Sequence, residues 1–130
     1  MSCQSDKTAI AGAFKHEDLL LRRSVEEMIL WAHRPLQQFP KAERHVFAAE
    51  IRRTMYELLR LVITANRRYY KKTTMQDMDV ALDLLRSQVR IAKDLEYLKF
   101  NDYEAWSKRL YETGNLLGGW LKWAGTQQRG

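Results

Sequence analysis

Arginine and lysine are the residues whose number and spacing in this chain point to a chemistry. Nine of the 22 Lys and Arg residues lie within residues 40–72. The acids of this segment are Glu43, Glu50 and Glu57, so its net charge is +6, equal to the formal charge of the whole chain. Basic side chains held on rigid elements bind phosphate backbones. The sequence therefore predicts a helical protein that faces a polyanion.

Two rows of basic residues carry this prediction. One row recurs every seven residues, about 10 Å apart along a helix, and consists of Arg53, Arg60 and Arg67. The other follows at i, i+4 and i+7 and consists of Arg86, Arg90 and Lys93. Arginine suits bidentate contacts with phosphate or carboxylate groups. Solvated surface is the competing interpretation for a single row, and ion pairs between subunits are another, with Glu57, Asp79 and Asp83 as available partners.

Arg68, Lys71 and Lys72 complete the residues that we expect to bind nucleic acid or a partner. Arg68 directly precedes the pair Tyr69-Tyr70, whose rings can stack on unpaired bases. Aromatic residues at a helix end are more often packing plugs, which favours a structural interpretation for the two tyrosines.

Enzymatic and metal chemistry are poorly supported. None of His16, His33 and His45 has a Glu three residues before it, as a di-metal carboxylate bundle requires, or an Arg five to seven residues before it, as one kind of helical RNase requires. Asp79 and Asp83 are one turn apart but read as helix N-terminal acids. We expect no catalytic residue, no metal site and no cofactor.

Size and composition limit the fold that must hold these residues. With 130 residues and 45% hydrophobic residues, the chain is expected to form one domain with a core. A single cysteine, Cys3, fits a reducing cytoplasm, and neither a membrane span nor a secretory signal is recognisable. We therefore expect a cytoplasmic protein without a membrane partner.

Apolar residues at helical spacing predict an all-α fold. The expected helices cover residues 17–39, 42–70, 74–100 and 102–124, with residues 1–16 as a flexible arm and 125–130 as a flexible tail. Thr73 or Thr74 is the expected N-cap of the third helix, and Pro35 should kink or tighten the end of the first. Short connections imply an antiparallel up-down-up-down four-helix bundle over residues 17–124.

Several positions carry finer expectations about packing. Leu20 is expected in the core, and Trp120 is expected to pack laterally within the bundle. In the third helix Leu84, Ile91, Leu95 and Leu98 flank the predicted buried stripe. The glycines of the fourth helix are expected to allow another backbone to approach closely, and they are Gly114, Gly118 and Gly119.

Four segments taken in order resemble a known family. They are Phe39-Pro40-Lys41 to Arg44, Ala65-Asn66-Arg67, Asp79-x-x-Leu82-x-x-Leu85-Arg86-x-x-x-Arg90-x-Ala92-x-Asp94-Leu95, and Gly114-x-Leu116-Leu117-Gly118-Gly119-Trp120. Together they resemble the accessory variability determinant (Avd) of diversity-generating retroelements, within the four-helix-bundle superfamily that includes proteins encoded in 23S rRNA intervening sequences. The likeness covers about residues 18–124.

The resemblance implies a basic homopentamer of four-helix subunits. Such proteins bind the retroelement's reverse transcriptase and its template RNA, with DNA as a further candidate, and they support mutagenic cDNA synthesis without catalysing it. Arg86 and Arg90 fall within the matched motif and are carried over as functional positions, and we expect both on the surface.

Two alternatives stay open at this point. Intervening-sequence relatives typically carry an Arg-Ala-x-x-Ser-Ile-Pro-x-Asn-Ile-Ala-Glu-Gly segment, whereas residues 52–60 here contain no Pro and no Ala-Glu-Gly. This departure favours the retroelement branch over an RNA-associated bundle of the intervening-sequence type. A helical nuclease is the alternative from a different class, and the missing Arg/His spacing argues against it.

Overall fold

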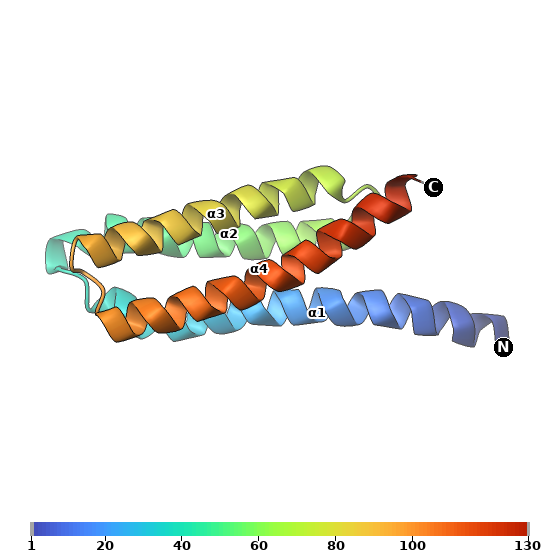
Figure 1. Ribbon diagram of the computed structural model, residues 1–130, viewed down its shortest axis with the longest axis horizontal. Helices are drawn as coiled ribbons and strands as arrows, with labels where there is room; N and C mark the ends of the chain where they lie inside the picture. Colours follow the sequence, from blue (N-terminus) through green and yellow to red (C-terminus); the bar gives the residue numbers. More distant parts are fainter. Residues whose placement is uncertain (1, 130) are drawn as a thin grey trace.

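The computed structural model is a bundle of long helices lying side by side (Figure 1). It describes the backbone of residues 2–129 and the side chains of residues 19–124. Over that range the helices are α1 (Ser2–Gln37), η1 (Lys41–Glu43, 3-10), α2 (Phe47–Arg67), α3 (Lys72–Asp94) and α4 (Phe100–Arg129). Consecutive α-helices run in opposite directions, and α1 and α3 each pack against both α2 and α4. The predicted all-α four-helix bundle is confirmed, and its order matches the predicted up-down-up-down arrangement.

The outer ends of the bundle differ from the expected ranges. Helix α1 begins at Ser2 and α4 continues to Arg129, so both extend past the predicted 17–39 and 102–124. Apolar periodicity marks only the part of a helix that packs on its neighbours, which explains the shorter prediction. The predicted flexible arm (1–16) and tail (125–130) lie outside the residues whose side chains are described, so these two remain predictions.

Helix α2 is shorter at both ends than the predicted 42–70, and the expected threonine N-cap of α3 is wrong. The N-cap of α3 is Lys71, and it forms no side-chain capping hydrogen bond. Thr74 is instead buried in the first turn, where its Oγ1 accepts a hydrogen bond from Arg68 Nη1 at 3.3 Å. The hydroxyl therefore ties the α2–α3 loop to α3 instead of capping the helix.

Helix α3 ends well before the predicted end near Phe100, because the chain turns through a left-handed residue. Glu96 has φ of 63°, and its N–H donates to the Lys93 carbonyl at 2.9 Å. The Tyr97 N–H donates to the Ala92 carbonyl, also at 2.9 Å. These two bonds form a Schellman motif, which usually has glycine at the left-handed position. No glycine marks the stop here, so the sequence pattern missed it.

The core follows the predicted apolar stripes closely. Trp106 is fully buried and meets Trp31 edge to face, with ring centroids 5.6 Å apart. The predicted lateral packing of Trp120 is confirmed, since it is only 3% exposed. Leu20 is the exception: it is 39% exposed, because Leu21 takes the inward position beside it. No described helix carries an apolar stretch long enough to cross a membrane.

The α1–α2 and α3–α4 connections lie at the same end of the bundle (Figure 1). Three aromatic rings close this end. Phe39 is fully buried, and its ring centroid lies 5.9 Å from that of Phe47 and 5.6 Å from that of Tyr97. The last turn of α1 tightens after Pro35, whose carbonyl accepts a hydrogen bond from the Gln38 N–H at 3.1 Å. This tight exit, one of the two outcomes expected of Pro35, directs Phe39 into the core.

Candidate nucleic-acid interface

A groove between α3 and α4 brings two of the predicted basic residues together with tyrosines. The groove has a volume of about 240 Å³ and is lined by Arg86, Arg90, Tyr103, Ser107, Leu110 and Tyr111. The arginines come from α3, and the other four residues come from α4. The surface therefore offers two guanidinium groups beside aromatic rings and a hydroxyl, which is a chemistry suited to phosphates and unpaired bases.

Arg86 lies against α4 and is partly covered there, but it remains at the surface, as expected. Its side chain is 36% exposed, and Nη1 lies 3.5 Å from Asp83 Oδ1. Its Nη2 occupies the space that a Cβ on Gly114 would need. A glycine in α4 thus makes room for the guanidinium, which holds Arg86 in a defined position at the groove.

The predicted role of the α4 glycines is correspondingly corrected. Gly114 accommodates a side chain, not a backbone, because Arg86 is its nearest neighbour. A Cβ on Gly118 or Gly119 would meet no atom within 4 Å, so no close approach within this subunit requires either glycine.

Arg90 and Lys93 continue the row on α3 with different surroundings. Arg90 is exposed and forms no ion pair with any residue whose side chain is described. The Lys93 ammonium lies 4.7 Å from the ring centroid of Tyr103 and 3.3 Å from Asp94 Oδ1. Arg90 is therefore the cation of this row most available to a ligand, while Lys93 is partly engaged by its neighbours.

The row on α2 is largely neutralised within its own helix. Arg53 pairs with Glu50, and Arg60 donates two hydrogen bonds to Glu57, one of them from Nε at 3.0 Å. The hydrogen bond and charge of Glu57 raise the pKa of Arg60, despite weak opposing desolvation. Arg67 is exposed, with no ion pair to the residues described. Exposed i, i+3 pairs of this kind are typical of solvated surface, so the α2 row is a weaker candidate than the α3 row.

The α2–α3 loop lies at the opposite end of the bundle from the α1–α2 connection (Figure 1). The loop and the start of α3 carry the remaining predicted basic residues. Lys71 Nζ donates to the Ala65 carbonyl at 2.7 Å and lies 5.9 Å from the ring centroid of Trp120, so it stabilises the end of α2. Arg68 is exposed but bonded to Thr74, and Lys72 is exposed in the first turn of α3. These cations lie apart from the groove.

Tyr69 and Tyr70 in this loop are not packing plugs. They are 86% and 75% exposed, and their rings meet edge to face with centroids 5.0 Å apart. The favoured structural interpretation is thus wrong, and both rings face solvent.

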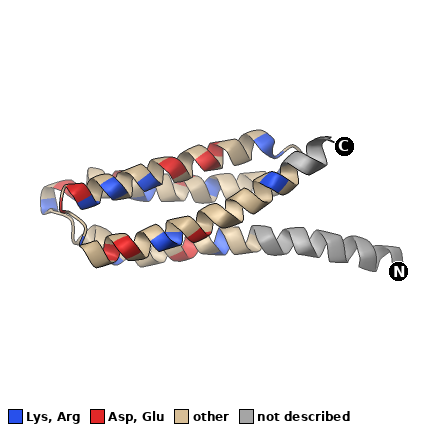
Figure 2. Cartoon of the chain, viewed as in Figure 1, with Lys and Arg blue, Asp and Glu red and all other residues tan. Residues whose placement is uncertain are grey.

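Charge along α3 changes sign, as the sequence predicts. Between Asp77 and Lys93 the acidic residues come first and the basic residues follow, while Lys72 at the start of the helix and Asp94 at its end have the opposite signs (Figure 2). The α4 residues of the groove escaped prediction. Their signal was present in the sequence, because Tyr103, Ser107 and Tyr111 recur every four residues and so share one face.

Among the described residues no group of His, Cys, Asp and Glu is arranged to hold a metal ion.

One family model matches this chain over the whole range whose side chains are described. The model of the bAvd-like family matches residues 19–124, which include every helix-packing residue described above. The chain belongs to the bAvd-like family. The resemblance to the accessory variability determinant is thereby confirmed, and both groove arginines lie inside the matched region. A search of curated proteins finds no match.

Proposed function

We propose that this protein is the non-catalytic accessory protein of a diversity-generating retroelement. In this role it binds the reverse transcriptase and the template RNA in the cytoplasm and supports mutagenic cDNA synthesis. Membership of the bAvd-like family supports the role, and the formal charge of +6 supports a polyanionic ligand. The observation that carries the RNA-binding part is the α3–α4 groove, where Arg86 and Arg90 lie beside Tyr111.

The groove offers two kinds of contact to single-stranded RNA. Arg90, which is exposed, and Arg86, which is positioned over Gly114, supply donors to successive phosphates. Tyr111 is 67% exposed at the same groove, so its ring has a free face for an unpaired base. Stacking distinguishes a single strand, RNA or DNA, from a duplex whose bases are covered.

Self-association has its own candidate surface on α3. Exposed apolar side chains follow one face of this helix at i, i+4, i+11 and i+15, with exposed fractions of 70%, 51%, 48% and 51%, and they are Val80, Leu84, Ile91 and Leu95. Monomers seldom expose a continuous apolar row of this kind. We propose that this row packs against other copies in a homopentamer, which would multiply the positive charge of each subunit.

RNA binding is tested by removing the groove cations without changing shape. We expect Arg86→Gln with Arg90→Gln to weaken binding of a fluorescent single-stranded RNA by about a hundredfold or more, since each charge-assisted contact contributes about tenfold or more. The slope of log affinity against log salt should fall by about 1.4, since each phosphate contact contributes about 0.7. Fluorescence anisotropy across a salt series measures both quantities.

Arg23→Gln is the matched control, because Arg23 is an exposed cation on α1 outside the groove. This single substitution removes one positive charge, half of what the double variant removes, and it should lower RNA affinity only slightly. Equal losses per charge at both places would refute the groove and leave only a general attraction of the basic surface. Affinity that is flat with salt would refute phosphate binding altogether.

A further inference from the structure

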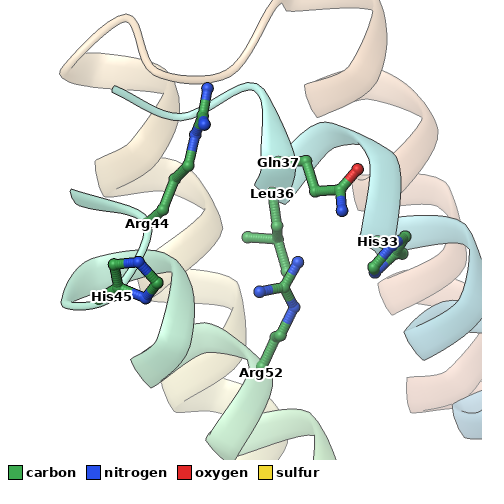
Figure 3. A pocket seen from close by; sticks show the side chains of 6 residues that line it. All are labelled: His33, Leu36, Gln37, Arg44, His45 and Arg52. Atoms are coloured by element: carbon green, nitrogen blue, oxygen red, sulfur yellow. The ribbon is translucent and has the colours of Figure 1, made fainter. Parts of the chain in front are cut away.

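A second pocket lies at the end of the bundle closed by Phe39, away from the α3–α4 groove. It has a volume of about 490 Å³ and is lined by His33, Leu36, Gln37, Arg44, His45 and Arg52. Figure 3 shows side chains from α1 on one side, the η1–α2 connection on the other, and Arg52 of α2 between them in this view. None of these residues belongs to the groove or to the rows of basic residues discussed above.

The electrostatics of this pocket favour an anion. Its six lining residues include two arginines and two histidines, and none is acidic. Two acids of neighbouring elements are already committed, since Glu50 pairs with Arg53 and Asp102 lies 3.5 Å from Arg34. Arg52 forms no ion pair within the described part of the chain. Its guanidinium can therefore hold a ligand without first breaking an internal contact.

The walls of the pocket are held in place by the core. Arg44 Nε donates to the Phe39 carbonyl at 3.0 Å, and Phe39 is locked between Phe47 and Tyr97. The same pocket borders the start of α2, whose N-cap Val46 provides no side-chain hydrogen bond to the first turn. The last turn of α1, which ends at Gln37, lines the same pocket, so its negative dipole end opposes the positive end of α2 and the attraction for an anion rests on the arginines.

We propose that this pocket binds the phosphate group of a nucleotide. Arg52 and the free guanidinium nitrogens of Arg44 bind the phosphate, because their donors match its oxygen geometry. The pocket falls in the range of about 300–1,000 Å³ typical for small-molecule sites, far more than a bare phosphate needs. Leu36 and the imidazole rings of His33 and His45 supply flat or apolar surface for the rest of the nucleotide. A free nucleotide and the terminal phosphate of an RNA strand share this chemistry.

Calorimetric titration of the full-length protein tests the site and separates these two sources. The probes are inorganic phosphate, AMP, ATP, and one RNA oligonucleotide with and without a 5′-phosphate. We expect Arg52→Gln to weaken binding of the phosphorylated probe by about tenfold or more, the loss expected for a charge-assisted phosphate contact. Arg23→Gln is the control: it removes the same charge, but Arg23 is exposed on α1 and does not line the pocket.

The outcomes are distinct. If the parent protein binds AMP or ATP more tightly than phosphate, and only Arg52→Gln loses this binding, the result supports the pocket with a free nucleotide as its ligand. If a 5′-phosphate strengthens oligonucleotide binding in the parent protein but not in Arg52→Gln, the result supports the proposed pocket, with the end of an RNA strand as its ligand. Equal losses in Arg52→Gln and Arg23→Gln, or no binding of any phosphorylated probe at millimolar concentration, overturn the proposal. Thermal unfolding monitored by circular dichroism checks that both variants fold.

This site and the groove can fail separately. The proposal does not depend on a reverse transcriptase partner, so AMP or ATP binding should be unchanged in the Arg86→Gln, Arg90→Gln variant. Loss of nucleotide binding in that variant would place the phosphate in the groove and overturn the pocket.

Discussion

Alanine substitution of the α4 glycines offers a direct test of how Arg86 is positioned. Gly118 and Gly119 face open space, whereas a Cβ on Gly114 would collide with Arg86 Nη2. Replacing a glycine by alanine in a helix interior stabilises it by about 1 kcal/mol, because alanine loses less backbone entropy on folding. Gly118→Ala and Gly119→Ala should each show about this full gain.

Gly114→Ala should show much less. The same gain in helix propensity is opposed by displacement of Arg86, whose side chain is only 36% exposed and lies 3.5 Å from Asp83. Moving a flexible guanidinium off α4 loses some packing and a partly exposed ion pair, together about 0.5–1 kcal/mol. The net change in the free energy of unfolding should therefore be close to zero.

A double-mutant cycle isolates this contact. In an Arg86→Ala background the nearest atom to the new Cβ becomes Leu82 Cδ2 at 3.6 Å, which is ordinary van der Waals contact. Gly114→Ala should then stabilise by about 1 kcal/mol, giving a coupling of about 0.5–1 kcal/mol between positions 86 and 114. Urea denaturation of the four proteins measures it. Gly118→Ala, run in both backgrounds, should show no coupling.

The reasoning is refuted if Gly114→Ala is equally stabilising in both backgrounds, because Arg86 would then not occupy the space over the glycine. RNA affinity gives a second readout. Gly114→Ala should weaken RNA binding although the Arg86 charge remains, whereas Gly118→Ala should leave it unchanged. Such a loss at constant charge would separate the position of Arg86 from its contribution to the overall field.

Two further predictions concern the end of α3 and its exposed face. Glu96→Gly should stabilise the protein by about 0.5–1 kcal/mol in urea denaturation, because Glu96 has φ of 63° and glycine adopts this conformation without steric cost. Glu104→Gly is the control: it lies within α4 and should destabilise the protein by about 1 kcal/mol. If both glycine variants were stabilised, the left-handed conformation of Glu96 could not be the cause. Leu84→Asp with Ile91→Asp should shift the mass measured by light scattering toward the monomer without lowering its stability, since both residues are exposed. Leu30→Asp, at a residue 76% exposed on α1, is the control, and an assembly unaffected by the α3 substitutions would contradict the proposed interface.

The sequence by itself determined the fold class and most of the core. Apolar periodicity is a local property of each helix, so the buried stripe of α2 from Ile51 to Ala65 could be read directly from the chain. The family also followed from the sequence, since each of its motifs is a short continuous segment of the chain. The positions of the helix ends were harder to predict from the sequence than the buried stripes. The stop of α3 depends on a left-handed Glu96, which carries no glycine signal.

Only the tertiary structure decided which basic residues can act together. Seven-residue spacing made the α2 row prominent, although Glu50 and Glu57, three residues before Arg53 and Arg60 in the same helix, pair with them and could have been recognised from the sequence. The groove depends on the register between α3 and α4, which sets Arg86 over Gly114 and Arg90 near Tyr111. The second pocket joins His33 to Arg52 across two helices. Such juxtapositions arise from packing between elements distant in sequence, and helical periodicity alone contains no information about them.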